Sequence, residues 1–444
     1  MVEHDLAKVG VEGSSPFSRS ILPLYFRALA RIGREDRQEI RLRSVNPQQR
    51  VLSGMRPTGR LHLGHYHGVL KNWLALQHTY ECFFFAADWH ALTTHYDEPG
   101  QLGQHTHDMV IDWLAAGVDP AAAKLFIQSQ VPEHAELHLL LSMITPLGWL
   151  ERVPTYKDQQ EKLKEKDLAT YGFLGYPLLQ SADILVYRAG LVPVGADQVA
   201  HVEITREIAR RFNHLYGREA GFGQRVDAAI GKLGKKSAQL YVDNRRAWQE
   251  KGDQLAHDSA RALVQTGSLS AADKEHLFGD LDGSGKIILP EPQALLTPAS
   301  KMAGLDGQKM SKSYGNTITL REEPEVVQTR IRKMPTDPAR VRRTDPGDPD
   351  KCPVWAWHEA YSGTEVKSWV QQGCRSAGIG CIECKQPVVD AINAELAPIR
   401  ERAQHFAGHP ELVRSILDQG RDAARTAAQA TLVEVRQAMG LAYR

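Results

Sequence analysis

The sequence predicts an α/β fold: a Rossmann-like domain built on a parallel sheet, interrupted by a helical insertion and followed by an all-helical carboxyl-terminal domain. Three observations support this prediction. From Val51 onward, short apolar runs alternate with apolar residues at helical spacing, a pattern typical of parallel strands joined by crossover helices. The stretch 222–285 is polar and helix-rich, and beyond Arg321 the pattern turns helical with intervening prolines.

The composition is that of a soluble globular protein. The chain has 444 residues, 42% of them hydrophobic and 24% charged, and this length suggests about three domains. A net charge of +1 excludes the broad positive field of a non-specific nucleic-acid binder. No apolar run reaches the roughly eighteen residues that span a bilayer, and the amino terminus lacks a secretory pattern. We therefore expect a cytoplasmic protein without membrane contact.

The expected elements follow in chain order. Strands are expected at 50–54, 82–88, 124–129 and 191–194, and helices at 63–76, 104–116, 133–143 and 198–212. The expected domains are a poorly ordered extension at 1–48, a Rossmann-like domain at 49–221 and 286–325, the insertion at 222–285 and the helical domain at 326–444. Neither the extension nor the insertion carries a motif that indicates a function. In open α/β sheets ligands collect at the carboxyl ends of the strands.

One loop matches a cation motif only in part. Five residues have the ligand spacing of a calcium loop, namely Asp280, Asp282, Ser284, Gly285 and Glu291. Prolines on both sides of the last ligand oppose the helix that should follow it, so a surface turn is favoured and calcium stays an alternative.

The first chemical motif is SGMRPTGRLHLGHYHG, at 53–68. It places a turn between the first strand and a helix that begins near Leu63. His62 and His65 are three residues apart and share one side of that helix, and Gly64 lets a flat ring approach the backbone. Alone, the pair is equally consistent with two histidines of no consequence.

The second motif is KMSKS, at 309–313. Its two ammonium groups and two hydroxyls are donors suited to a polyphosphate. A short basic loop is usually only surface, but its pairing with a histidine-glycine turn after the first strand is harder to dismiss. Together the two motifs indicate a nucleotide site.

The two motifs resemble the signatures of class I aminoacyl-tRNA synthetases. The runs SGMRPTGRLHLGHY, YPLLQSADILVY and LVPVGADQ resemble the tryptophanyl-tRNA synthetase family, from about Val51 to the carboxyl terminus. The resemblance implies an enzyme, a tryptophan–tRNA ligase, that activates L-tryptophan with ATP and Mg2+ and passes the tryptophanyl group to tRNA(Trp). It also implies a homodimer. Because the substrate carboxylate is already ionised, catalysis should rest on positioning and charge stabilisation.

The resemblance also assigns the ATP site. Catalytic roles fall to His62, His65, Lys309 and Lys312. ATP contacts fall to Arg56, Pro57, Thr58, Gly64, His65, Gly195, Ala196, Asp197, Lys309, Met310, Ser311, Lys312 and Ser313. Two positions depart from the family pattern: Arg56 replaces a frequent Gln, and Ala196 replaces the Glu of GEDQ, which puts a side-chain role at 196 in doubt.

The tryptophan site is assigned in the same way. Asp183 would accept the indole N–H, a donor-only group that suits an ionised carboxylate. The remaining assignments are Gln180, His90 and Gln198 as polar contacts, and Leu52, Ile184, Val192 and Val194 as an apolar slot. Taken alone, Asp183 is consistent with a helix cap, and the four apolar residues are consistent with ordinary core packing.

Two other functions remain open at this point. A tyrosyl-tRNA synthetase has the same fold and a similar Gln-to-Asp spacing. A non-catalytic relative that binds RNA or a nucleotide is the second alternative, and intact Lys309, Lys312 and His65 argue against it.

The carboxyl-terminal part suggests tRNA and metal binding. Residues 326–345 hold six basic side chains against two acidic ones, which suits a tRNA backbone. Four cysteines, Cys352, Cys374, Cys381 and Cys384, have the spacing C-x21-C-x6-C-x2-C. Some members of the family carry a four-iron four-sulfur cluster on almost this spacing, so such a cluster is expected first, structural zinc second and free thiols third.

Overall fold

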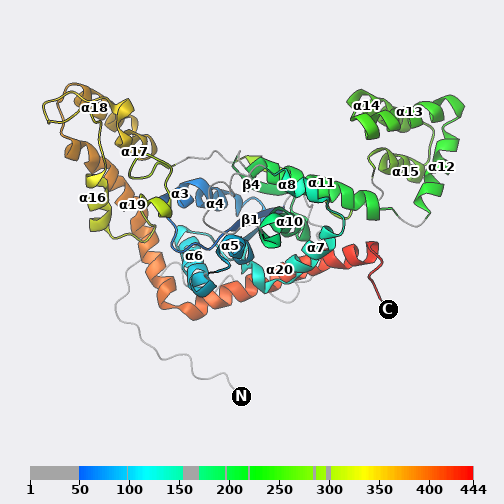
Figure 1. The fold of residues 1–444 in the computed structure, drawn as a ribbon, viewed down its shortest axis with the longest axis horizontal. Coiled ribbons are helices and arrows are strands. Elements are labelled where there is room, and N and C mark those ends of the chain that lie inside the picture. The colour runs from blue at the N-terminus through cyan, green and yellow to red at the C-terminus, as the bar shows by residue number, and fades with distance from the viewer. Residues whose placement is uncertain are drawn as a thin grey trace, which may run out of the picture. The chain divides into compact units, whose positions relative to one another are not determined.

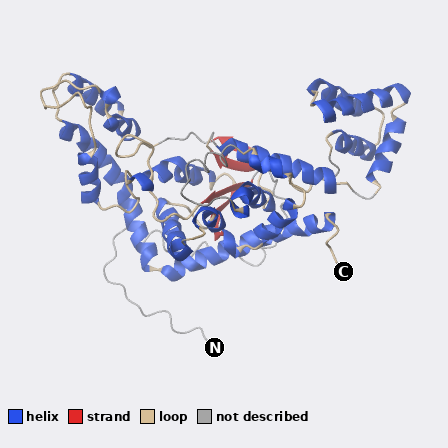
Figure 2. Cartoon of the chain, in the orientation of Figure 1, coloured by secondary structure: helices blue, strands red, loops and turns tan. Residues whose placement is uncertain are grey.

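The computed structural model describes residues 50–97, 99–153, 170–195, 198–218, 221–283, 287–296 and 302–443. The expected extension at 1–48, the pair Ala196 and Asp197, and Ser284 and Gly285 of the calcium-like loop lie outside these residues. In the described parts, a small sheet is surrounded by helices (Figures 1 and 2).

A five-stranded parallel sheet organises the described residues. Its strands are β1 (Arg50–Met55), β2 (Glu81–Ala86), β3 (Ala123–Ile127), β4 (Leu191–Val194) and β5 (Gln293–Leu296), in the spatial order β3-β2-β1-β4-β5. Val51 pairs with Cys82 on one side and with Leu191 on the other. The α/β prediction and its four strands are confirmed, and β5 was not predicted.

Helices cover both faces of the sheet, as parallel sheets require. The helices that follow the strands are α3 (Leu63–His65), the π-helix η2 (Tyr66–Leu70), α4 (Lys71–Leu76), α5 (Asp88–His95), α6 (Leu102–Ala116), α7 (Glu133–Ser142), α8 (Leu147–Glu151), α10 (Tyr171–Val186) and α11 (Val199–Tyr216). Trp73 and Trp113 pack with Phe84 in one core. Phe83 and Phe126 pack in the other.

Two expected boundaries were wrong by a few residues. Asp88, expected to close the second strand, is the first residue of α5. Ser129, expected in the third strand, lies in a short 3-10 helix at Gln128–Gln130. Both polar residues follow the carboxyl end of a strand, where the chain turns into a helix.

The insertion forms four helices with a core of their own. These are α12 (Phe222–Lys232), α13 (Lys235–Lys251), α14 (Gln254–Thr266) and α15 (Ala271–Leu281). Phe222, Tyr241, Val264 and Leu277 are among the buried residues of this core.

The regular structure of the carboxyl-terminal part is helical in its described residues. It comprises α16 (Pro324–Lys333), α17 (Pro353–Tyr361), α18 (Thr364–Arg375), α19 (Cys381–Gly408) and α20 (Pro410–Ala438). The long helix α19 packs against α6 (Figure 1), and α20 packs against β3. A Cβ at Gly420 of α20 would overlap the backbone of Leu125, so this close approach requires glycine.

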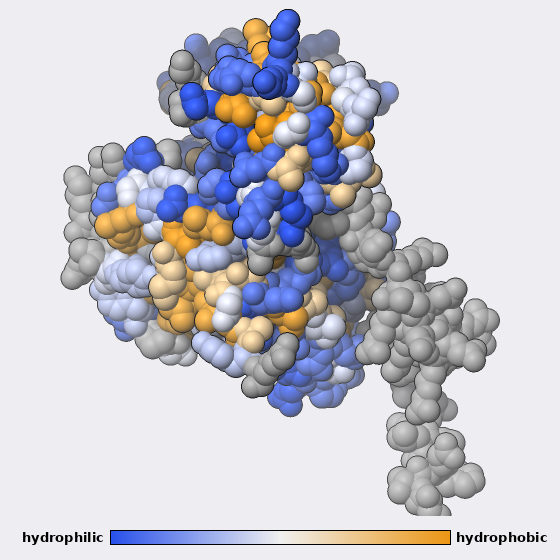
Figure 3. All heavy atoms as spheres, turned by 90° about the vertical axis from the view of Figure 1, so that its right-hand side faces the viewer, coloured by the Kyte–Doolittle hydropathy of each residue, from blue (hydrophilic) through white to orange (hydrophobic). Residues whose placement is uncertain are grey.

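Large apolar side chains are exposed on α7, α8 and the start of α10. Leu139, Met143, Leu147 and Tyr171 are each more than half exposed. The space-filling view shows hydrophobic side chains gathered in patches on the face turned to the viewer (Figure 3). In the part of the chain that the structure describes, no helix is both long and apolar enough to span a bilayer.

Candidate functional site

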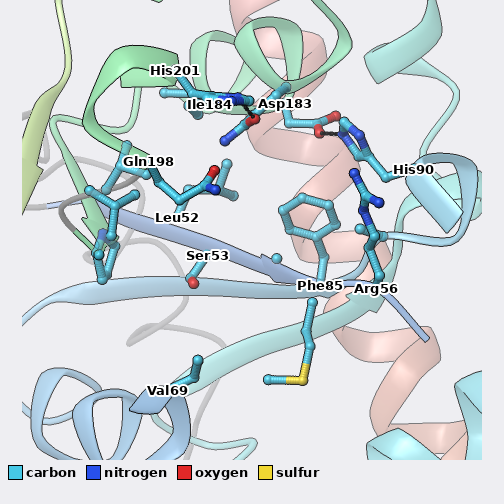
Figure 4. Close-up of a pocket in the computed structure, with 18 of the residues that line it drawn as sticks. Leu52, Ser53, Arg56, Val69, Phe85, His90, Asp183, Ile184, Gln198 and His201 are labelled. Carbon is cyan, nitrogen blue, oxygen red and sulfur yellow. Dashed lines mark hydrogen bonds and ion pairs between the residues drawn. The ribbon is translucent and has the colours of Figure 1, made fainter. Parts of the chain in front are cut away.

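A cavity of about 430 Å3 opens beside β1 and β4 and is bounded by α5, α10 and α11 (Figure 4). Its volume lies in the range of about 300–1,000 Å3 that is usual for small-molecule sites. Expected site residues make up much of its lining: Leu52, Arg56, His65, His90, Gln180, Asp183, Ile184, Val192, Val194, Gly195 and Gln198. The structure thus brings the expected tryptophan contacts together around one space.

The two motifs meet although they lie 254 residues apart in the chain. Lys312 Nζ donates to the carbonyl oxygen of Thr58 at 2.8 Å and to its hydroxyl at 3.3 Å. The amide N of Gly64 lies 3.3 Å from Met310 Sδ. Burial lowers the pKa of Lys312 to about 8. The KMSKS loop therefore sits on the turn that follows β1.

The two histidines of the first motif shape the start of its helix. His62 Nδ1 accepts from the amide of Gly64 at 3.1 Å, His65 Nδ1 accepts from the amide of His62 at 3.3 Å, and the rings lie 3.8 Å apart. Burial, and then the charge of Lys312, lowers the pKa of His62 to about 4. Burial, the neighbouring His62 and Lys312 lower that of His65 to about 3. Both rings are therefore neutral at pH 7.

Glycine is required in this motif by a neighbouring side chain. A Cβ at Gly64 would lie 2.9 Å from the ring of His62. The flat ring that we expected to lie against Gly64 is, in this structure, the imidazole of His62.

A residue just outside the second motif holds its loop. Asn316 Oδ1 accepts from the amide of Ser311 at 2.8 Å, and Asn316 Nδ2 donates to the carbonyl of Lys309 at 3.2 Å. The hydroxyls of Ser311 and Ser313 lie 2.8 Å apart, and Lys309 is exposed. Gly304 makes room, because a Cβ there would overlap the side chain of Asn316. No pattern in the sequence indicates this role of Asn316.

Asp183 lies inside α10 and is 1% exposed, so the helix-cap alternative is wrong. His90 Nε2 donates to Oδ2 at 2.7 Å, while His134 Nδ1 and Gln128 Nε2 donate to Oδ1 at 2.6 and 2.8 Å (Figure 4 for His90). Burial acts to raise the pKa of Asp183, but the hydrogen bonds and charges of His134 and His90 outweigh burial and hold the pKa well below its usual value. The buried carboxylate stays ionised.

Sequence reasoning missed several polar residues of this site. Gln128 and His134 follow β3, and His134 Nε2 lies 2.6 Å from the hydroxyl of Tyr187. His201 lines the cavity, and its Nδ1 donates to Gln180 Oε1 at 2.7 Å. For Gln128 and His134, the sequence does hold a signal: both follow the third expected strand. Polar residues at the carboxyl end of a parallel strand commonly face the ligand.

The charges that line the cavity are few. Among the described lining residues, Arg56 is the one lysine or arginine and Asp183 the one carboxylate. The guanidinium of Arg56 points towards His90 (Figure 4), and burial lowers the pKa of Arg56. Arg56 also lines an adjoining cavity of about 640 Å3 with Pro57 and Thr58.

The four carboxyl-terminal cysteines line one small cavity, together with Arg340 and Lys385. Arg340 Nη1 lies 3.7 Å from Cys374 Sγ, and His358 Nε2 lies 3.4 Å from Cys384 Sγ. Burial raises the pKa of Cys384 to about 12, and the other three thiols add to the effect. Within the described ranges, no three His, Cys, Asp or Glu side chains are already arranged to hold a metal ion.

The basic segment near these cysteines is partly turned inward. Arg340 is 8% exposed and donates to the carbonyl of Arg343 at 3.2 Å, and Arg330 donates to the carbonyl of Thr317 at 2.8 Å. Arg340 is therefore not a surface contact for a polyanion, contrary to expectation, whereas Lys333 and Arg342 are exposed.

Comparison with known proteins identifies similar sequences over most of the chain. Residues 44–266 and 253–397 match the family described as tRNA synthetases class I (W and Y). A tryptophan–tRNA ligase of Ralstonia nicotianae is 67% identical over 396 residues, which cover 89% of this chain and 99% of that protein. One of Thermotoga maritima is 44% identical over 397 residues, covering 89% and 100%.

Solved structures show the same arrangement. A tryptophanyl-tRNA synthetase from Campylobacter jejuni, complexed with ADP and tryptophan, matches with a TM-score of 0.67 at 27% identity and covers 88% of this chain and 100% of that one.

Proposed function

Because the chain belongs to the class I tRNA synthetases for tryptophan and tyrosine and, among them, to the tryptophan–tRNA ligases, we propose that the cavity beside β1 and β4 is its tryptophan and adenylate site. The observation that carries this proposal is the contact of Lys312 with Thr58 at 2.8 Å, which brings the KMSKS loop onto the turn at the edge of that cavity. The tyrosyl and non-catalytic alternatives are set aside. The enzyme acts, in this proposal, in the cytoplasm.

The reaction begins when the carboxylate of tryptophan attacks the α-phosphorus of ATP and pyrophosphate leaves. No base is needed for this step, so the side chains position the reactants and stabilise charge. Arg56 meets the negative charge of the carboxylate and the α-phosphate, since it is the lining cation among the described residues. Lys309, Lys312, Ser311 and Ser313 follow the departing pyrophosphate, which Mg2+ accompanies as part of the ATP substrate.

The adenosine lies between the two motifs. His62 and His65, both neutral at pH 7, act here as hydrogen-bonding and packing groups, because their lowered pKa values exclude a permanent charge. Gly64 and Met310, in contact with each other, hold the two motifs together beside the base, and Pro57 and Thr58 flank the phosphates. Gly195, with Ala196 and Asp197 outside the described residues, meets the ribose.

The indole enters the apolar slot formed by Leu52, Ile184, Val192 and Val194. Asp183 accepts the indole N–H at the end of this slot. His90, Gln198 and Gln180 hold the polar groups of the amino acid, and His201 orients Gln180 through the 2.7 Å hydrogen bond.

Pyrophosphate exchange with each amino acid in turn tests chemistry and specificity together. We expect label to enter ATP with tryptophan and not with tyrosine or any other amino acid. Exchange supported equally by tyrosine contradicts the assignment of Asp183 and its slot.

In the second step the tryptophanyl group passes to tRNA(Trp). We assign catalysis to 49–221 and 286–325, and anticodon contact to the helical part at 326–444, where Lys333 and Arg342 are exposed. We assign dimerisation with a second copy to Leu139, Met143 and Leu147, because these large apolar side chains are exposed close together in the sequence and an interface would cover them. Sedimentation tests this assignment: wild type should be dimeric and Met143→Glu monomeric.

The cysteine cavity has a donor set that fits a sulfur-bound metal centre. Four free thiols face one space, beside the guanidinium of Arg340. A Cβ at Gly347 would lie 2.7 Å from Cys374 Sγ, so the backbone packs directly on a ligand sulfur. We assign a four-iron four-sulfur cluster to Cys352, Cys374, Cys381 and Cys384, with zinc as the second choice.

Metal analysis of anaerobically purified protein decides between these centres. Iron with acid-labile sulfide and visible absorption supports the cluster, and stoichiometric zinc replaces it with the second choice. A metal-free protein in which the four thiols of this cavity are titratable refutes both.

A further inference from the structure

The carboxylate of Asp183 is held by a buried polar network that reaches beyond the cavity. Gln128, His134 and Tyr187 are each 0% exposed. None of these three lines the cavity, whereas His90, the other partner of Asp183, does. Oδ1 of Asp183 is therefore bonded by residues that lie outside the cavity lining, and Oδ2 is bonded by a residue that lines the cavity.

Counting acceptor positions shows what is left for a ligand. An ionised carboxylate offers about four lone-pair sites, two on each oxygen. Oδ1 receives hydrogen bonds from His134 at 2.6 Å and Gln128 at 2.8 Å, and is filled. Oδ2 receives one, from His90 at 2.7 Å. Among the described contacts, the free acceptor position is on the oxygen that shares its side with the cavity.

Tyr187 holds the His134 ring at the nitrogen that does not face Asp183. Burial, and then the charges of Asp183 and Glu133, raises the pKa of Tyr187 well above its usual value, so its hydroxyl keeps its proton. His134 Nδ1 donates to the carboxylate, and its Nε2 lies 2.6 Å from the hydroxyl of Tyr187. The ring is thus held between the hydroxyl and the carboxylate, and its Nδ1–H points at Oδ1 of Asp183.

We propose that His134 is a positioning residue for substrate specificity: with Gln128 it fills Oδ1 of Asp183 and leaves Oδ2 as the acceptor for the ring N–H of the substrate. This inference rests on the proposed contact between Asp183 and the indole. Without His134, Oδ1 regains a free acceptor site and the carboxylate loses its fixed orientation. The enzyme should then prefer a substrate with a ring N–H less strongly over one that lacks it.

The sharpest test compares tryptophan with its benzothiophene analogue, in which sulfur replaces the indole N–H. The measured quantity is the ratio of kcat/KM for the two substrates in pyrophosphate exchange. A hydrogen bond to a charged group is worth about 1.5–3 kcal/mol, so His134→Ala should lower this ratio about ten- to a hundredfold. The KM for ATP should not change.

Two matched variants separate positioning from packing. In His134→Asn the amide nitrogen replaces Nδ1 and should restore most of the ratio. In His134→Gln the amide reaches the place of Nε2, and the ratio should stay low. Comparing His134→Asn with His134→Gln tests the proposal even if His134→Ala fails to fold.

Three outcomes decide the inference. A ratio that falls in His134→Gln and recovers in His134→Asn supports it. Equal losses for both substrates, with the ratio unchanged in each His134 variant, overturn it and leave a purely structural histidine. If Asp183→Asn also leaves the wild-type ratio unchanged, the proposed indole contact itself fails, which distinguishes the two failures.

Discussion

Replacing Lys312 tests the meeting of the two motifs. Its ammonium group donates twice to Thr58, at 2.8 and 3.3 Å, and in the proposed mechanism it stabilises the charge of the departing pyrophosphate. Loss of one preorganised donor costs about 3 kcal/mol of barrier, so Lys312→Ala should slow pyrophosphate exchange on the order of a hundredfold. Lys236→Ala, an exposed lysine of the insertion, is the matched control and should exchange at the wild-type rate.

The pH profile adds an independent readout. Because burial lowers the pKa of Lys312 to about 8, the charged form predominates below that pH and is lost as pH rises through it. The kcat/KM for ATP should therefore fall above about pH 8 in wild type. Lys312→Arg stays charged and should lack this fall. An unchanged rate in Lys312→Ala, or the same alkaline fall in Lys312→Arg, refutes the reasoning.

Two further substitutions probe the cavity and the packing around it. Arg56→Ala should slow adenylate formation about ten- to a hundredfold because it removes a charged donor, and the rate of Arg56→Gln should lie between that of Arg56→Ala and that of wild type. Equal rates in wild type and both variants would show that the guanidinium meets no reacting charge. Gly420→Ala forces a Cβ into the backbone of Leu125 and should lower the free energy of unfolding by about 1–3 kcal/mol in urea titrations. Gly408→Ala, where a Cβ meets nothing within 4 Å, is its control, and equal stability of the two variants would contradict the packing argument.

The fold was predictable where the apolar pattern is strong. The run ECFFFA of β2 is buried along almost its whole length and reads as a central parallel strand. The strand β5 reads QALL, begins with an exposed Gln293 and ends with an exposed Leu296 at the edge of the sheet, where it pairs with β4. Four residues of this kind carry too weak a pattern to be distinguished from a loop.

The site was predictable where contiguous residues carry its chemistry. The two motifs each lie within one short segment, so their residue types could be recognised together. The partners of Asp183 come instead from the loop after β3, from α5 and from α7, and only the order of the strands brings them within hydrogen-bonding distance. The role of Asn316 depends similarly on a glycine twelve residues earlier, Gly304, which no local rule connects to it.

The two ends of the site differ in how firmly their polar groups are held. At the amino-acid end, Asp183 has three of its acceptor positions filled by side chains buried in the fold, so its geometry is set before a substrate arrives. At the ATP end, Lys309 and Ser313 are exposed on a short loop. Lys312 joins this loop to the turn after β1, and because an ammonium group has three donors and Thr58 takes two, one remains for a phosphate oxygen. The contact with Thr58 therefore holds the loop in place and still leaves the charge of Lys312 available to the proposed phosphate.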